Sequence, residues 1–199
     1  MSEYQFTKDW FAWAPEVWKQ LTPMLPHGIR RSFLEIGSFE GRSMVWTAEN
    51  MMNPGDMLYC IDTWTGGEEH KAGGEDMGSV ESRFDHNREK VLAENDITIF
   101  KHKDTSTRWL ARVFEEGEVF DFAYIDGSHI AKDVLTDACM AWPLLKPKGI
   151  MVFDDYMWGD PRDILHRPKP AIDAFTNIFA EEVEIIHVGY QLVVRKKGE

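Results

Sequence analysis

Acidic residues directly follow two apolar runs that have the composition of buried strands. One run ends before Asp126 and the other before Asp154 and Asp155, and His129 lies three positions beyond Asp126. If the two runs are neighbouring parallel strands, their ends bring three carboxylates and one imidazole to the same edge of a sheet. Carboxylate oxygens bind divalent cations, and an imidazole accepts protons near neutral pH. The sequence therefore predicts a divalent metal site with a general base beside it.

Two simpler interpretations remain open for these residues. Asp126 or Ser128 could cap a helix that begins near Ile130, and Asp154 and Asp155 could form a solvated strand end. We favour the metal interpretation because four suitable groups fall at the ligand-binding edge of one predicted sheet.

A second chemical signal is the glycine-containing stretch from Glu35 to Gly41, which lies between the first predicted strand and its helix. Gly37 permits a tight turn and the close approach of a ligand, and Gly41 lets the helix begin near the strand. The spacing differs from the dinucleotide pattern Gly-x-Gly-x-x-Gly, which disfavours a nicotinamide enzyme. An ordinary strand-to-helix turn is the alternative interpretation.

Two further acids follow the second and third predicted strands. Asp62 ends the second strand, where a carboxylate can accept hydrogen bonds from both hydroxyls of a ribose. Asp104 follows the third strand, where it could meet the edge of an adenine. Either acid could instead cap the helix that follows it, and for Asp104 this alternative is equally plausible because Thr105 and Ser106 come next.

Short apolar runs alternate with longer amphipathic stretches, which predicts a mainly parallel, doubly wound α/β sheet. The predicted strands are residues 32–36, 57–61, 97–100, 120–125 and 150–153. The predicted helices are a segment after Gly41 and residues 80–92, 106–114 and 130–145, with Pro143 loosening the end of the last one.

The two ends of the chain differ from this alternation. A helix from Pro170 to about Ala180 is followed by two strand-like runs, which predict a C-terminal antiparallel hairpin. Residues 1–31 form an aromatic-rich N-terminal segment, and residues 32–199 form the main domain. The N-terminal aromatic residues could form a lid over a ligand, but packing on the domain or in a homo-oligomer interface is the interpretation we favour.

Composition excludes several classes of protein. The chain has 199 residues, which suits one domain, and a formal net charge of -12 without a Lys/Arg run, so a nucleic-acid partner is not expected. No signal peptide and no apolar run long enough to cross a bilayer are recognisable. Cys60 and Cys139 lie among apolar neighbours and fit a reducing compartment. We therefore expect a cytoplasmic protein that does not act at a membrane.

Four motifs together resemble a class I S-adenosylmethionine-dependent methyltransferase. They are Glu-x-Gly-x-x-x-Gly, the acid at Asp62, Ile-Asp-Gly-Ser-His, and Val-Phe-Asp-Asp. The set is most similar to small metal-dependent O-methyltransferases related to the macrocin and mycinamicin enzymes, and the likeness runs from about Phe33 to the final hairpin. Phe39 departs from the commoner pattern, which often has a glycine at that position.

The resemblance implies a Rossmann-like methyltransferase fold and a role for each candidate residue. S-adenosylmethionine would be held by Glu35, Gly37, Ser38, Gly41, Asp62 and Asp104, Mg²⁺ would be held by Asp126, Asp154 and Asp155, and His129 would be the base. The implied acceptor is a hydroxyl of a small molecule or sugar. A metal-independent N- or O-methyltransferase and a non-catalytic cofactor-binding module are the alternatives.

Overall fold

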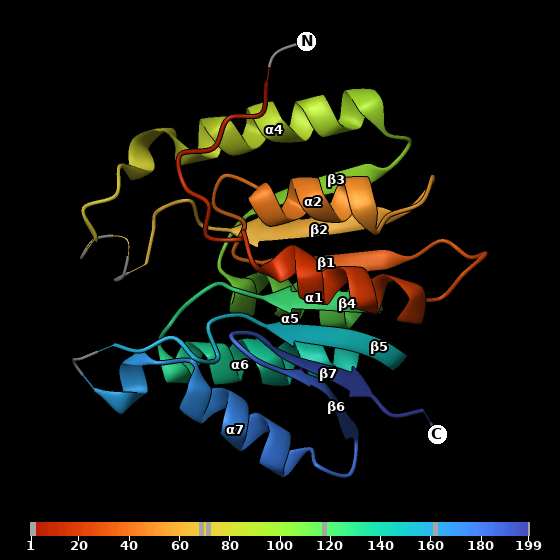
Figure 1. Cartoon of the computed structure of the whole chain (residues 1–199), viewed down its shortest axis with the longest axis vertical. Coiled ribbons are helices and arrows are strands. Elements are labelled where there is room, and N and C mark those ends of the chain that lie inside the picture. Colours follow the sequence, from red (N-terminus) through yellow and green to blue (C-terminus); the bar gives the residue numbers. More distant parts are fainter. Residues whose placement is uncertain (1–2, 68–69, 71–72, 117–118, 161–162, 199) are drawn as a thin grey trace.

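A seven-stranded sheet with helices on both faces organises the computed structural model, which describes residues 3–67, 70, 73–116, 119–160 and 163–198 (Figure 1). The strands are β1 (Ser32–Ile36), β2 (Met57–Asp62), β3 (Thr98–Lys103), β4 (Phe120–Ile125), β5 (Leu145–Phe153), β6 (Val183–Val188) and β7 (Leu192–Lys196). Their spatial order is β3-β2-β1-β4-β5-β7-β6. The first five strands are parallel, and β7 pairs antiparallel with both β5 and β6. The predicted doubly wound sheet and C-terminal hairpin are confirmed.

Helices cover the sheet in two layers. They are α1 (Ala14–Leu21), α2 (Arg42–Asn50), α4 (Val80–Glu94), α5 (Ser106–Glu116), α6 (Ala131–Ala141) and α7 (Lys169–Ile178). Buried side chains of α1, α2 and α4 share one core with the sheet, and those of α5, α6 and α7 share the other. Within the described ranges, none of the helices is both long and apolar enough to cross a membrane.

The helix predicted for residues 130–145 is shorter than expected, and the strand after it is longer. Helix α6 ends at Ala141, and Trp142–Leu144 forms a 3-10 turn before β5 starts at Leu145. Pro143 explains the early end, because proline has no backbone N–H to continue the helical hydrogen bonds.

Continuous apolar strands are required because the sheet is buried on both faces. All six residues of β4 are buried, and successive side chains point to opposite faces. Phe122 and Tyr124 therefore enter the core shared with α1, whereas Ala123 and Ile125 enter the core shared with α6.

Strand register places the predicted chemical residues at one edge. Ile36 pairs with Ile125, and Ile125 pairs with Phe153. The next residues continue the ladder, since the Asp126 N–H donates to the Ile36 carbonyl at 2.8 Å and the Asp154 N–H to the Ile125 carbonyl at 3.1 Å. The strand order reverses direction between β1 and β4, which is where open α/β sheets bind ligands.

Helix α1 is part of the domain core. Trp18 is fully buried, and its ring lies 5.2 Å from that of Phe122 and 4.8 Å from that of Tyr124. The Trp18 indole N–H donates to Oε1 of Gln191 at 2.8 Å. The N-terminal segment is thus anchored to β4 and to the beginning of the last strand.

An ion pair closes the opposite edge of the sheet. Arg31 and Asp56 are both almost fully buried, and their side chains approach to 2.6 Å. Asp56 also accepts the Arg31 backbone N–H at 2.8 Å and the Asn53 N–H at 2.8 Å. Removing one member leaves the other charge buried without compensation, which is strongly destabilising.

We therefore expect Asp56→Ala to lower the free energy of unfolding by about 3–5 kcal/mol. Urea denaturation measures this change directly. Glu16→Ala is the control, because Glu16 pairs with Lys19 but its side chain is 82% exposed; such exposed pairs contribute at most about 1 kcal/mol. Equal midpoints for Asp56→Ala and Glu16→Ala would contradict the assigned role of this pair.

Candidate active site

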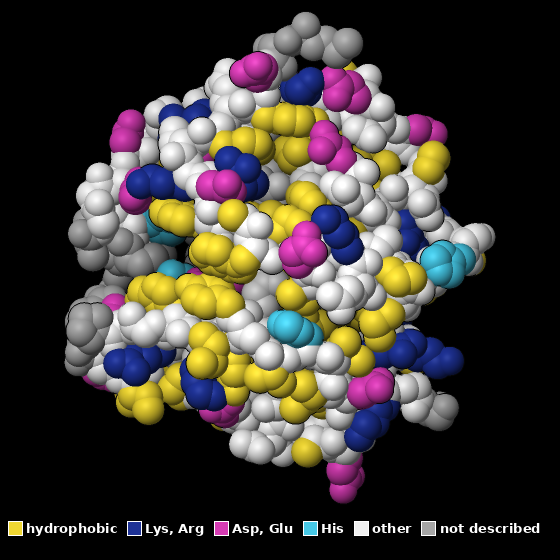
Figure 2. Space-filling model, viewed as in Figure 1, with side chains coloured by type: hydrophobic (Ala, Val, Ile, Leu, Met, Phe, Trp, Pro, Cys, Tyr) yellow, Lys and Arg dark blue, Asp and Glu magenta, His cyan; other side chains and the backbone are white. Residues whose placement is uncertain are grey.

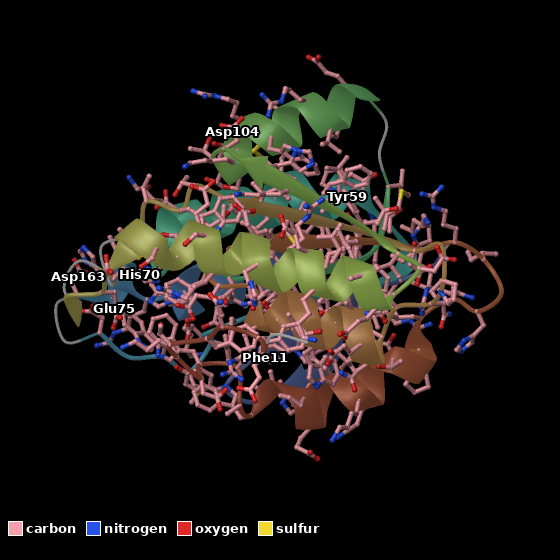
Figure 3. All side chains as sticks on the ribbon, turned by 90° about the horizontal axis from the view of Figure 1, so that it is seen from above. Phe11, Tyr59, His70, Glu75, Asp104 and Asp163 are labelled. Atoms are coloured by element: carbon pink, nitrogen blue, oxygen red, sulfur yellow. The ribbon has the colours of Figure 1, made fainter. Side chains whose placement is uncertain are left out.

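A cavity of about 790 Å³ opens at the edge where the parallel strands end. Residues that follow β1, β2, β3, β4 and β5 line it, together with residues of the N-terminal segment and the β6–β7 turn. A hollow bordered by hydrophobic side chains is visible in the left half of Figure 2. Figure 3 shows two of the lining residues, His70 and Glu75, close together at this end of the molecule.

The turn after β1 requires glycine at two positions. Gly37 has φ 86°, and a Cβ there would lie 2.1 Å from the backbone oxygen of Asp126. Gly41 has φ 78° and precedes α2, and a Cβ there would lie 2.6 Å from the Met44 side chain. The expected tight turn is therefore present, and it brings the β1 and β4 strand ends into contact.

Asp62 fixes the conformation of this turn. Its Oδ2 accepts the backbone N–H groups of Ser38 and Phe39, both at 2.9 Å, and its Oδ1 accepts the Trp64 N–H at 2.7 Å. Phe39 has φ 48°, and its carbonyl accepts the Trp64 indole N–H at 2.8 Å. Asp62 and Ser38 both line the cavity, so the carboxylate holds the turn and also faces the ligand space.

Glu35 lies beneath the turn, where it is only 2% exposed. Burial raises the pKa of Glu35 from 4.5 to about 8. Hydrogen bonds from the Ser38 and Ser43 side chains partly oppose this increase. Ser38 lines the cavity, and Glu35 is not among its described lining residues.

Asp104 lines the cavity, but its carboxylate is engaged outside it. Its Oδ1 accepts the Thr105 backbone N–H at 2.8 Å and lies 3.4 Å from the Arg108 guanidinium. Its Oδ2 accepts a hydrogen bond from the Arg112 guanidinium at 2.7 Å. The structure therefore places Asp104 at the start of α5, away from the acidic cluster.

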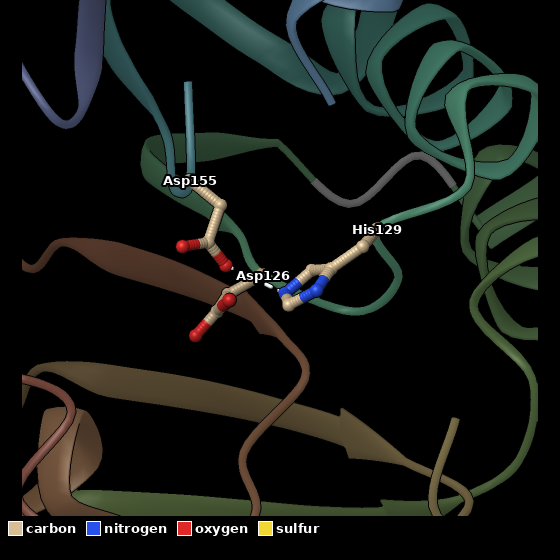
Figure 4. Close-up of side chains that lie close together, drawn as sticks. All are labelled: Asp126, His129 and Asp155. Carbon is tan, nitrogen blue, oxygen red and sulfur yellow. Dashed lines mark ion pairs between the residues drawn. The ribbon is translucent and has the colours of Figure 1, made fainter. Parts of the chain in front are cut away.

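The predicted metal and base residues meet at the other side of the turn. Asp126, His129 and Asp155 each offer one ligand atom, and these atoms all lie within 4.8 Å of one another (Figure 4). Nε2 of His129 lies 2.6 Å from Oδ2 of Asp155. Asp155 has φ 54°, a left-handed conformation that aspartate tolerates better than most residues.

Asp154 is the third predicted carboxylate, and it lies beside that group. Its Oδ1 accepts the Asp155 backbone N–H at 2.8 Å, and its Oδ2 accepts the Tyr124 hydroxyl. The same hydroxyl lies 3.0 Å from Oδ2 of Asp126. Tyr124 thus links the two acids. The sequence analysis did not predict Tyr124 as a site residue, although residues two apart on a strand point to the same face, which was the available signal.

These acids are held in an environment that disfavours charge. Burial and the nearby Asp154 and Asp155 raise the pKa of Asp126 well above its ordinary value. Burial and Asp155 raise the pKa of Asp154 to about 6. A bound divalent cation would relieve both the desolvation and the repulsion, and carboxylate oxygens suit Mg²⁺. The residues therefore fit such an ion.

Aromatic side chains also border the site, including N-terminal ones for which the sequence left a lid and simple packing both open. The Trp10 ring lies 5.0 Å from Phe39 and 5.7 Å from His70. On the acidic side, the Trp158 ring lies 4.4 Å from His129. Contacts of this kind join segments far apart in the chain, so local spacing does not show which rings meet.

Solved structures with similar folds are known. The O-methyltransferase from Bacillus cereus in complex with SAH is 16% identical, with a TM-score of 0.60 and coverage of 96% of this chain and 93% of that one. The O-methyltransferase TomG from Streptomyces achromogenes is 21% identical, with a TM-score of 0.62 and coverage of 90% and 77%. MycE from the mycinamycin pathway, in complex with Mg, SAH and mycinamycin VI, is 16% identical, with a TM-score of 0.58 and coverage of 98% and 51%.

The fold is thus the Rossmann-like methyltransferase fold. A family described as "Methyltransferase domain" matches residues 34–156, which is more than half of the chain. The protein belongs to this family and is a class I S-adenosylmethionine-dependent methyltransferase. A search of curated proteins finds no match.

The raised pKa of Glu35 leads to a pH-dependent prediction. The folded state binds the Glu35 proton more tightly than the unfolded state, so this stabilisation is complete below pH 4.5 and is lost as the pH rises to about 8. Glu35→Gln should therefore gain stability relative to the wild type between about pH 5 and pH 8, on the order of 3 kcal/mol. Melting temperatures across this range measure the difference.

Glu89→Gln is the control, because Glu89 lies on the exposed side of α4 and its replacement also removes one negative charge. Its melting temperature should track that of the wild type across the range. A constant difference between Glu35→Gln and the wild type at every pH would refute the assigned shift.

Proposed function

We propose that this methyltransferase transfers a methyl group to a hydroxyl of a small molecule, with assistance from Mg²⁺. One observation carries the proposal: the group formed by Asp126, His129 and Asp155 lies in the same cavity as the glycine turn. An O-methyltransferase needs both a cofactor cradle and a base beside the acceptor, and this arrangement supports both.

The cofactor would lie along the turn after β1. Gly37 and Gly41 allow the backbone to approach it, Ser38 lines the cavity, and the buried Glu35 would support the turn from beneath. Asp62 lies at the end of β2, where its carboxylate suits the ribose hydroxyls. Asp104 would contribute through its backbone and position, because its carboxylate is engaged by arginines. When bound, S-adenosylmethionine supplies an activated methyl group.

The acceptor hydroxyl would be deprotonated next to His129. Asp126 and Asp155 would hold the divalent ion with Asp154, and such an ion lowers the pKa of a neighbouring hydroxyl. His129 lines the cavity and would take the proton, and its pairing with Asp155 would fix the orientation of the ring. In-line placement of hydroxyl and methyl group provides much of the remaining rate enhancement.

A metal-independent methyltransferase is the second candidate, and the 2.6 Å pairing of His129 with Asp155 favours it. A histidine oriented by a carboxylate can act as a general base without a metal. In that case the acids would orient an N- or O-acceptor, and turnover would persist with excess chelator.

Thermal unfolding with S-adenosylhomocysteine, with and without Mg²⁺, tests the proposed ligands. A ligand that binds only the folded state stabilises it by about 2.7 kcal/mol at a hundredfold excess over its Kd. We expect a rise in melting temperature with the cofactor product and a further rise with Mg²⁺. Asp126→Asn should retain the first rise and lose the second, because one ligand oxygen is replaced by an amide.

Asp96→Asn is the matched control, because Asp96 is exposed and does not line the cavity. It should retain both rises. An unchanged response to Mg²⁺ in Asp126→Asn would remove the metal assignment, and no rise with S-adenosylhomocysteine in the wild type would remove the proposed cofactor site.

His129→Gln tests the base. Loss of a general base lowers kcat by about 10²–10⁴-fold, while the affinity for S-adenosylhomocysteine should stay unchanged. Methyl transfer to an accepted substrate and calorimetric binding measure the two quantities. His27→Gln, an exposed substitution outside the cavity, should leave both unaltered. Wild-type kcat in His129→Gln would eliminate the proposed role.

A further inference from the structure

Aromatic side chains from three separate segments border the acidic cluster. Trp13 precedes α1, Trp158 follows β5, and Tyr190 lies in the β6–β7 turn, and all three line the cavity. The Trp13 ring lies 5.1 Å from that of Tyr190 in an edge-on arrangement. Trp13 is 49% exposed although it packs against Tyr190. The cavity therefore presents accessible aromatic surface beside its carboxylates.

Backbone contacts fix these side chains next to the proposed reacting groups. The Trp158 N–H donates to the Asp155 carbonyl at 2.9 Å, and the Met157 N–H donates to the Tyr190 carbonyl at 3.3 Å. Burial and the neighbouring Asp155 raise the pKa of the Tyr190 hydroxyl. A flat molecule that stacks on these rings would have its polar edge at Asp155 and His129.

The charges around the cavity favour a narrow class of acceptor. Among the described lining residues, the lysine and arginine side chains are those of Lys8 and Arg42, and both are already paired. Lys8 lies 2.6 Å from Glu75, and Arg42 lies 3.3 Å from Asp9. An anionic group entering the cavity would therefore meet no unengaged guanidinium or ammonium among these residues.

Acidic side chains predominate among the lining residues. They are Glu40, Asp62, Glu75, Asp104, Asp126, Asp133, Asp137, Asp154 and Asp155. They outnumber the two basic side chains among the described lining residues, Lys8 and Arg42, so the cavity is acidic in composition. Like charges at short range are repulsive, particularly where solvent is partly excluded.

We infer that the acceptor is a hydroxylated ring compound, uncharged or cationic, that stacks among Trp13, Trp158 and Tyr190, and that phosphorylated and carboxylated acceptors are rejected. This inference rests on the proposed function and names the substrate class of the same site. The shared chemistry is a hydroxylated ring with an apolar face that can lie against an aromatic side chain, which a phenol or a sugar can provide.

The N-terminal segment offers a matched pair of tryptophans for the test. Trp10 and Trp13 both line the cavity and have nearly equal exposure, 47% and 49%. Trp10 packs on Phe39 in the cofactor turn, whereas Trp13 packs on Tyr190 near the acidic cluster. Trp13→Ala should therefore affect the acceptor, and Trp10→Ala should affect the cofactor.

The experiment measures acceptor binding to the full chain by calorimetry, with saturating S-adenosylhomocysteine and Mg²⁺. Catechol, dopamine and protocatechuate share one ring and differ in charge, being neutral, cationic and anionic. Methyl glucoside and uridine diphosphate glucose provide the corresponding neutral and anionic sugars. In the aromatic series, we expect catechol and dopamine to bind at least tenfold more tightly than protocatechuate. If the acceptor is a sugar, we expect methyl glucoside to bind at least tenfold more tightly than uridine diphosphate glucose.

Substitutions then assign the binding to the aromatic residues. Trp13→Ala should weaken the preferred ring compound by about tenfold, the upper range for an aromatic contact, without changing the affinity for S-adenosylhomocysteine. Trp10→Ala should show the reverse pattern. Phe114→Ala, an exposed aromatic substitution on α5 outside the cavity, should change neither affinity.

Several outcomes would overturn the inference: tighter or equal binding of the anionic members, no binding by any neutral or cationic ring, or unchanged acceptor affinity in Trp13→Ala. Failure of the proposed function is recognised separately, because the thermal shift with S-adenosylhomocysteine is recorded on the same samples. If S-adenosylhomocysteine still raises the melting temperature but the anionic acceptors bind as well as the others, only the inferred substrate class is rejected.

Discussion

The parallel pairing of β1 with β4 is the constraint on which the site depends. This pairing brings the Gly37 backbone so close to Asp126 that a Cβ at Gly37 would lie 2.1 Å from the Asp126 oxygen. The glycine turn and the acidic strand end therefore cannot move independently. Because the strand order reverses between these two strands, the turn and the acids open into one cavity. The glycine turn and the acidic cluster thus lie on the two sides of this backbone contact.

The compensated ion pair and the clustered carboxylates lie at opposite edges of the sheet. The buried Arg31–Asp56 pair joins the chain before β1 to the chain before β2, where both charges are compensated. At the carboxyl edge, Asp126 and Asp154 are buried beside each other and linked by the Tyr124 hydroxyl, with raised pKa values. Carboxylates gathered in this way are unfavourable for folding alone and become favourable when a cation binds.

The N-terminal segment contributes both to packing and to the cavity. Trp18 is buried against β4, whereas Trp10 and Trp13 remain about half exposed at the cavity mouth. The two roles are compatible because helix α1 anchors the segment while the preceding residues extend along the opening. Thr7 is held there by Glu40, which accepts its backbone N–H at 2.6 Å and its hydroxyl at 2.7 Å.

The sequence by itself determined the strand and helix alternation, the C-terminal hairpin, and the acids that follow the strands, because these depend on local periodicity and on residues adjacent in the chain. The sequence also predicted that Asp126, Asp154, Asp155 and His129 would meet at one edge of the sheet. Only the tertiary structure decided the individual partners of these acids, since it paired Asp155 with His129, placed Asp154 against Tyr124, and turned Asp104 toward Arg112. Side-chain direction depends on partners contributed by distant elements, and it cannot be read from spacing along the chain. For the same reason, the sequence did not reveal that Trp13, Trp158 and Tyr190 border one cavity.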